Sequence, residues 1–123
     1  MPSRAPSEFT ASLRSSGLFS LRALLEVAQS EKDARLRAAA VRNLGAMDSD
    51  ESGASLVSLY GSEQDAGVRR AVLDAFVAQD NCPALVKLGR SEKDAGMRRA
   101  IVEHLSALEC SEAADFLMEI LKK

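Results

Sequence analysis

The chain has 123 residues, of which 46% are hydrophobic and 28% are charged, a balance typical of a folded globular unit. Sixteen basic and eighteen acidic side chains give a formal net charge of −2, which argues against a nucleic-acid binder because such proteins usually carry a basic surface. No apolar run approaches the length of a membrane span, and the first residues do not resemble a secretory signal, so a cytoplasmic location is the default expectation.

The N-terminal part of the chain carries the weakest pattern. We expect residues 1–6 to be a disordered tail and residues 7–123 to form a single domain. The stretch SEFTASLRSSG (7–17) is predicted to be a weak leading helix that ends at Gly17.

One phrase then occurs three times: SEKDARLRAAAVRNL (30–44), SEQDAGVRRAVLDAF (62–76) and SEKDAGMRRAIVEHL (91–105). Its aspartates, Asp33, Asp65 and Asp94, are 32 and 29 residues apart, which is within the range of helical repeat arrays. Aspartate is a favourable N-cap because its carboxylate accepts hydrogen bonds from the free N–H groups of the first helical turn. Each phrase is therefore predicted to be a turn followed by a helix, over residues 34–47, 66–79 and 95–108.

Apolar residues recur in register after each aspartate, with the spacing of an amphipathic helix. The four predicted core rows are Leu36, Val68 and Met97; Ala39, Ala71 and Ala100; Ala40, Val72 and Ile101; and Leu44, Phe76 and Leu105.

A shorter helix is predicted before each phrase, over residues 21–29, 54–61 and 83–90, and SEAADFLMEILKK predicts a terminal capping helix over 111–122. The repeats then span residues 18–47, 50–79 and 81–108. Helix pairs that cannot bury their apolar faces alone must stack on one another. The sequence thus predicts an all-α fold, an α-solenoid of antiparallel helix pairs that forms a right-handed superhelical array.

An Asp, two residues, an aliphatic residue, an Arg and an Ala-rich helix follow one another in each copy, and this pattern resembles the HEAT-repeat family. It is especially similar to the short bacterial HEAT-like repeats related to phycobilisome lyases. The resemblance implies that the second helix of each pair lines a concave face, and that such arrays often form one segment of a larger bacterial protein. It also implies that the following residues fix the turns and form ladders between repeats: Asp33, Arg37, Asp65, Arg69, Asp94 and Arg98.

The remaining charged residues of the second helices are the candidate site. They would form the polar floor of a concave groove for a protein or peptide partner: Arg42, Arg70, Asp74, Arg99, Glu103 and His104. The alternative is a solvent-exposed surface in which Arg70 pairs with Asp74 and Arg99 with Glu103, four residues apart on the same helix.

Metal and cofactor sites are not expected. The turn DSDESG (48–53) has the opening spacing of an EF-hand loop, but Leu59 stands where that loop needs a bidentate Glu. His104 is the single histidine, and a lone histidine on a helix is usually a surface residue. Cys82 and Cys110 lack metal-ligand spacing, and we expect two reduced thiols that lie too far apart for a disulfide.

These observations favour a non-catalytic interaction module without a cofactor, binding a protein or peptide and neither nucleic acid nor a membrane. The alternatives are a lyase-type enzyme that attaches a chromophore, which the resemblance suggests, and a purely structural spacer. Apolar residues near the N-terminal end predict a monomer or a weak end-to-end dimer: Phe9, Leu13, Leu18 and Phe19.

Overall fold

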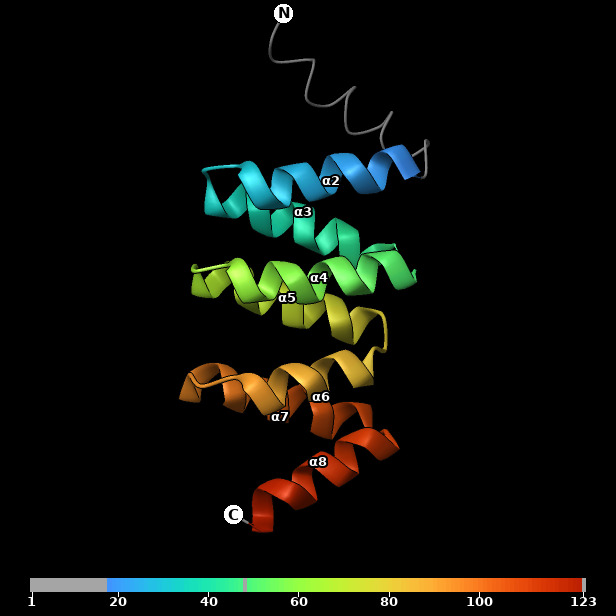
Figure 1. Cartoon of the computed structure of the whole chain (residues 1–123), viewed down its shortest axis with the longest axis vertical. Helices are drawn as coiled ribbons and strands as arrows, with labels where there is room; N and C mark the ends of the chain where they lie inside the picture. Colours follow the sequence, from blue (N-terminus) through green and yellow to red (C-terminus); the bar gives the residue numbers. More distant parts are fainter. Residues whose placement is uncertain (1–17, 48, 123) are drawn as a thin grey trace, which may run out of the picture.

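The computed structural model describes residues 18–47 and 49–122, with side chains from residue 21 onward, and this part of the chain is entirely helical. The helices follow one another along the long axis of the molecule (Figure 1), and the predicted all-α repeat fold is confirmed. Their bounds are α2 Leu18–Ser30, α3 Ala34–Ala46, α4 Asp50–Ser62, α5 Ala66–Ala78, α6 Cys82–Ser91, α7 Ala95–Leu108 and α8 Ser111–Lys122. The predictions for residues 1–17 lie outside the described residues.

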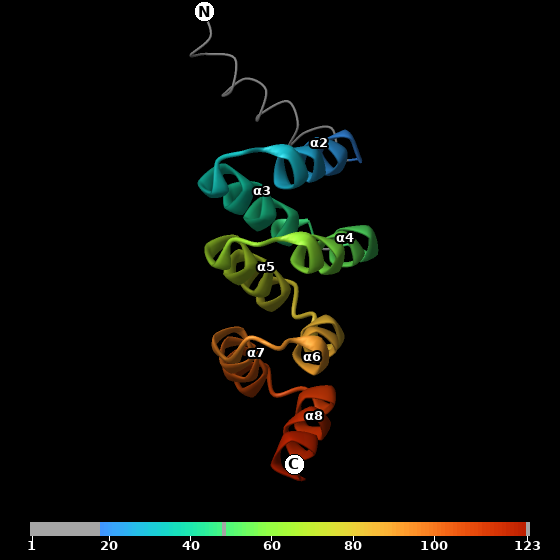
Figure 2. The same cartoon turned by 60° about the vertical axis from the view of Figure 1, so that its left-hand side comes forward.

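The helices form two layers, which Figure 2 shows side by side. The first-helix layer consists of α2, α4, α6 and α8, and the second-helix layer consists of α3, α5 and α7. Successive members of each layer pack against one another, and each second helix packs on the first helix of its own pair. This is the architecture of an α-solenoid, in which every repeat contacts mainly its neighbours.

The three aspartates of the repeated phrase cap the second helices, as the sequence predicts. Asp33 accepts a hydrogen bond from the backbone N–H of Arg35 (2.8 Å) and Asp65 from that of Val68 (3.0 Å). Asp94 accepts from the N–H of Met97 (2.9 Å). Each bond satisfies a donor that the helix itself leaves free, so the start of every second helix is fixed locally.

Helices α2, α4 and α6 begin earlier than predicted. Helix α4 starts at Asp50 rather than at residue 54, because the hydroxyl of Ser49 caps it by accepting from the N–H of Ser52 (3.1 Å). Asp50 and Glu51 therefore lie in the first helical turn, where their charge complements the helix dipole, and residues 50–53 of the DSDESG stretch are helical. Helix α6 has 10 residues where α4 has 13, which accounts for the shorter spacing of the third repeat.

Two of the predicted core rows are complete and two are broken in the first repeat. The row Ala40, Val72 and Ile101 is buried, and so is the row Leu44, Phe76 and Leu105. Leu36, however, is 50% exposed, whereas its counterparts Val68 and Met97 are buried, and Ala39 is also exposed. The described part of the chain has no second helix before α3, so the side of α3 on which these two residues lie has no neighbour there.

The second helices approach most closely where α3 meets α5. A Cβ built on Gly45 would lie 2.6 Å from the Cβ and 2.8 Å from the Cα of Ala75. Only glycine permits this separation, because neither of the opposing atoms belongs to a side chain that could rotate away.

A similar contact attaches the last helix. A Cβ on Gly89 of α6 would lie 2.7 Å from the ring of Phe116, so the aromatic side chain of α8 fills the space that the glycine leaves. None of the helices in the described part is long and apolar enough to cross a membrane.

Candidate functional site

The six predicted partner-binding residues all lie in the second-helix layer. Arg42 lies on α3, and the others lie on α5 and α7. Five of the side chains are exposed, and His104 is half-buried. The structure therefore places the candidate residues at the surface, on neighbouring helices.

One pair of these residues is in contact, and it joins two repeats. His104 Nε2 of α7 lies 3.5 Å from Asp74 Oδ1 of α5. Ala75 and His104 stand at the same position of their repeats, ten residues after the capping aspartate. Ala75 of α5 packs on α3, so this position faces the preceding second helix, and in α7 it is occupied by His104. When the imidazole is protonated, this contact becomes an ion pair between repeats.

The intrahelical pairs of the alternative interpretation are not formed. No ion pair joins Arg70 to Asp74, or Arg99 to Glu103, among the residues with described side chains. Asp74 is directed instead to the histidine of the next repeat. The guanidinium groups of Arg70 and Arg99 are exposed on adjacent helices.

The arginines of the repeated phrase form a ladder, but their partner is a glutamate. Arg37 donates from Nε and Nη2 to the two carboxylate oxygens of Glu63, at 3.0 and 3.1 Å. Its Nη1 donates to the backbone carbonyls of Glu31 (2.8 Å) and Lys32 (3.0 Å). One side chain thus ties the turn of its own repeat to the turn of the next repeat.

The second rung repeats this connection with an aromatic residue added. Arg69 donates to Glu92 (2.6 Å), and its guanidinium lies 4.3 Å from the centroid of the Tyr60 ring. The hydroxyl of Tyr60 donates to the same carboxylate oxygen. The Nε of Arg69 is buried and makes no hydrogen bond to the described residues, so its cation is stabilised by the ring face and by Glu92.

The rungs shift the pKa values of the groups that form them. Burial raises the pKa of the Glu63 carboxyl, but hydrogen bonds from Arg37 and from the backbone N–H of Asp65 outweigh burial and lower the pKa below its usual range. The Glu92 pKa is lowered against burial in the same way, by the hydroxyl of Tyr60 and the backbone N–H of Asp94. Burial and the bond to Glu92 hold the pKa of Tyr60 well above its ordinary value.

Sequence reasoning identified the ladder arginines but not their acceptors. Glu63 and Glu92 are the second residues of their phrases, and a glutamate stands at this position in all three copies. That recurrence was a usable signal. Arg98 is exposed and forms no such rung with the described residues. A rung joins an arginine to the glutamate of the next phrase, whereas Glu92 belongs to the same phrase as Arg98.

The hollows that we describe lie in the first-helix layer, not beside the candidate residues. The largest, about 410 Å³, opens between the N-terminal ends of α4 and α6. Others of about 270, 340 and 210 Å³ lie between α2 and α4, α4 and α6, and α6 and α8. All are open depressions in which the following polar side chains stand beside small or aliphatic ones: Ser49, Asp50, Gln79, Asn81, Arg37, Glu63, Arg69, Lys87, Glu92, Arg90, Glu112 and Asp115.

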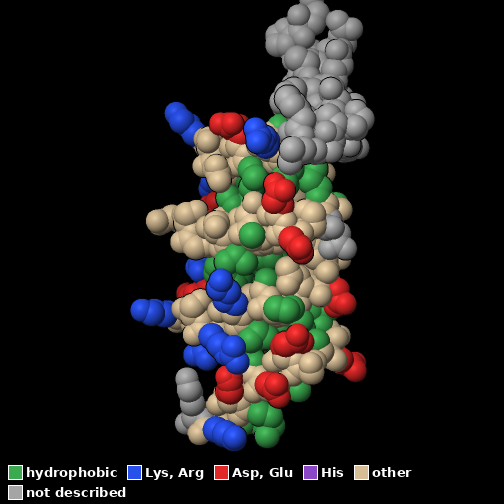
Figure 3. Space-filling model, turned by 45° about the vertical axis from the view of Figure 1, so that its right-hand side comes forward, with side chains coloured by type: hydrophobic (Ala, Val, Ile, Leu, Met, Phe, Trp, Pro, Cys, Tyr) green, Lys and Arg blue, Asp and Glu red, His purple; other side chains and the backbone are tan. Residues whose placement is uncertain are grey.

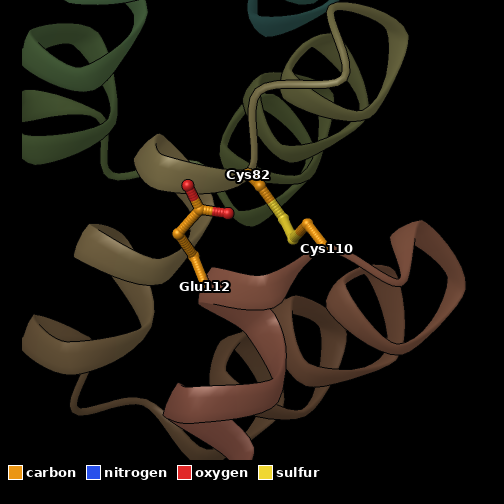
Figure 4. A group of neighbouring side chains, drawn as sticks. All are labelled: Cys82, Cys110 and Glu112. Atoms are coloured by element: carbon orange, nitrogen blue, oxygen red, sulfur yellow. A yellow bond between two sulfur atoms is a disulfide. The ribbon is translucent and has the colours of Figure 1, made fainter.

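The expectation for the two cysteines is wrong. Cys82 and Cys110 form a disulfide, and their Cα atoms are 6.6 Å apart. The expectation assumed that helices of successive repeats hold these residues too far apart. In the fold, α6 and α8 are adjacent members of the first-helix layer, and their N-terminal ends meet, as Figure 4 shows. The carboxylate of Glu112, from the first turn of α8, lies beside the sulfur atoms.

Stacked helix pairs with an Arg–Glu ladder define this chain as an α-helical repeat protein. The model of the HEAT-repeat family matches residues 14–77, more than half of the chain, and the chain belongs to this family. Residues 97–123 match the PBS lyase HEAT-like repeat. No match was found among curated proteins or solved structures.

Proposed function

We propose that the chain is a non-catalytic protein-binding module and that its partner docks on the second-helix layer, at α5 and α7. The observation that carries this proposal is the pair of exposed guanidinium groups of Arg70 and Arg99. They occupy matching positions on adjacent helices and lack an acidic partner among the described residues of their own helices. Two such groups suit a partner segment that carries carboxylates.

The frame beneath these residues supports this proposal. The rungs from Arg37 to Glu63 and from Arg69 to Glu92 fix the repeats relative to one another, and the close contact of Gly45 with Ala75 leaves no slack between α3 and α5. A pre-organised surface loses little conformational entropy on binding. The side chains of Arg70 and Arg99 are the main groups that a partner would have to order.

The distribution of charge also favours a protein partner. The face drawn in Figure 3 carries both signs of charge, with Lys and Arg mainly toward the left of the view and Asp and Glu mainly toward its centre and right. With a formal charge of −2, the chain lacks the basic excess that binding to phosphate backbones requires. Mixed charges give specificity and orientation to protein contacts.

Charge reversal tests the proposal. A tagged wild-type chain, the variant Arg70→Glu/Arg99→Glu and the control Arg22→Glu/Lys87→Glu are used to capture partners, which are quantified by mass spectrometry. The control makes the same change of charge on the exposed side of α2 and α6. We expect a set of proteins that the control retains and the α5–α7 variant loses.

Three outcomes contradict the proposal. Equal capture by all three chains would exclude the α5–α7 surface, and loss in the control alone would place the partner on the first-helix layer. If no protein is enriched over a tag-only capture, the spacer alternative is favoured.

The match of residues 97–123 to a lyase-related repeat keeps the enzyme alternative testable. A site for a tetrapyrrole needs aromatic walls, and the aromatic side chains that the structure describes, Tyr60, Phe76 and Phe116, are all buried. Titration with a bilin should therefore leave its absorbance spectrum unchanged. A spectral shift that saturates with the protein would favour the lyase alternative.

A further inference from the structure

A cluster of metal-ligating side chains lies away from the proposed docking surface, where α6 and α8 begin. The Sγ atoms of Cys82 and Cys110 and a carboxylate oxygen of Glu112 all lie within 4.8 Å of one another. Cys82 is buried, Cys110 is half-buried and Glu112 is exposed. Figure 4 shows the side chains of Cys82 and Glu112, from the starts of α6 and α8, beside that of Cys110 in the connection before α8.

The donor set suits a soft divalent cation. Thiolate sulfur is the preferred protein ligand of Zn²⁺, and a carboxylate commonly completes its tetrahedral shell. Cys82 is the first residue of α6, and Cys110 directly precedes α8. The positive ends of the two helix dipoles meet at the sulfur atoms, and this favours the thiolate form that a metal needs.

The surroundings leave space for a fourth ligand. A depression of about 210 Å³ lies between α6 and α8, and it is lined by Glu112 and by Pro83, the residue after Cys82. Asp115 lines the same depression, one helical turn beyond Glu112. A water molecule bound to the metal can occupy this space and donate a hydrogen bond to a carboxylate.

We propose that the reduced form of the chain binds Zn²⁺ through Cys82, Cys110 and Glu112, with water as the fourth ligand. Reduction by two molecules of a small thiol transfers two electrons to the disulfide; the small thiols leave as their own disulfide, and their two protons pass to the cysteines. Zn²⁺ then displaces these two protons as it binds the sulfur atoms. The disulfide and the metal are mutually exclusive, and each ties the start of α8 to the start of α6.

The test is titration of the full chain with Zn²⁺ after reduction by a phosphine, which avoids competition from added thiols. We expect one ion per chain, up to two protons released near neutral pH, and no binding at this cluster by the oxidised chain. Titration with Co²⁺ should give a thiolate-to-cobalt charge-transfer band.

The variants separate the roles of the ligands. Cys110→Ser and Cys82→Ser should lose the Co²⁺ band and bind Zn²⁺ no better than the double variant. Serine is a favourable residue directly before a helix, so Cys110→Ser keeps the test valid if Cys82→Ser does not fold, as judged by circular dichroism. Glu112→Gln should weaken binding by at least about tenfold, while the control Glu26→Gln, at an exposed glutamate of α2, should keep the wild-type affinity and the Co²⁺ band.

Three results would overturn the assignment. The first is a reduced wild-type chain that titrates like the double cysteine variant, and the second is a Co²⁺ complex without a thiolate band. The third is unchanged affinity in Glu112→Gln, which would remove the carboxylate from the site.

Discussion

Replacing Gly45 with alanine tests the close approach of α3 and α5. The added Cβ would lie 2.6 Å from the Cβ of Ala75 and 2.8 Å from its Cα. Carbon atoms in favourable contact are about 3.5 Å apart or more, so the two helices must separate locally by about 1 Å. That separation loosens the packing of α5, whose side chains Val72 and Phe76 are fully buried.

Two effects of opposite sign determine the magnitude. Alanine in place of glycine within a helix stabilises the fold by about 0.5–1 kcal/mol, because the unfolded chain loses freedom. Overpacking of a filled interface costs about 1–3 kcal/mol. The steric effect is the larger one here, since the opposing atoms include backbone. We expect Gly45→Ala to lower the free energy of unfolding by about 1–2 kcal/mol.

Gly61 provides the matched control, because it also lies in a helix and a Cβ there would meet nothing within 4 Å. Gly61→Ala should raise the free energy of unfolding by about 0.5–1 kcal/mol. Urea denaturation of the two variants and the wild type, followed by circular dichroism, measures both changes. If Gly45→Ala unfolds at the wild-type midpoint or above it, the contact between α3 and α5 is not as close as described.

Three further predictions concern the ladder and the disulfide. Reduction of the disulfide between Cys82 and Cys110, which are 28 residues apart, should lower the free energy of unfolding by about 3.5 kcal/mol on a chain-entropy account, whereas the double serine variant should not respond to the reductant. The pKa of Glu63 is lower in the fold than its ordinary value of 4.5, so its contribution to stability is present above that pH and is lost as the pH falls through the lower folded value. The thermal unfolding temperature of Glu63→Gln should therefore fall less steeply with acid than that of the wild type, and an unchanged profile would contradict the rung. The pKa of Tyr60, the single tyrosine, is raised above 10.0, so tyrosinate absorbance should appear at higher pH in the native chain than in denaturant. Stability should fall as the pH rises past 10, because the unfolded chain then loses the proton first. Equal titration midpoints in the two states would contradict the burial of Tyr60 against Glu92.

Local signals predicted the helices well. The caps Asp33, Asp65 and Asp94 act within their own first turn, so their role can be read from neighbouring residues. The start of α4 was missed because the apolar pattern begins later than the helix, whose first turn is capped by Ser49 and carries acidic residues.

Contacts between repeats were harder to predict, because they depend on how far each helix is displaced from the previous one. Glu63 bonds to Arg37, 26 positions away, and Glu92 bonds to Arg69, 23 positions away. A repeat length of about thirty residues does not indicate which of these side chains meet. The pair of His104 with Asp74 is offset by one position between copies, so it replaced the intrahelical pair that the spacing of four favoured.

The disulfide was missed for the same reason. Cys82 and Cys110 were placed at the openings of their helices, but the sequence does not state the distance between successive first helices. A separation of nearly one repeat brings two such positions together when the N-terminal ends of successive first helices meet, as those of α6 and α8 do. The candidate surface residues were located on the helices that were predicted, and their role stays a prediction until the charge-reversal experiment is done.

The ladder also restricts where the length of this chain can change during evolution. Helices α4 and α6 both end at the serine that precedes a ladder glutamate, although α6 is shorter by one helical turn. The difference in length lies at the start of the helix, next to the connection from α5, where no rung is formed. An insertion between Ser91 and Asp94 would displace Glu92 from Arg69, whereas an insertion near residue 80 would leave the rung intact. Natural length variation among related arrays should therefore collect in the connection from a second helix to the next first helix.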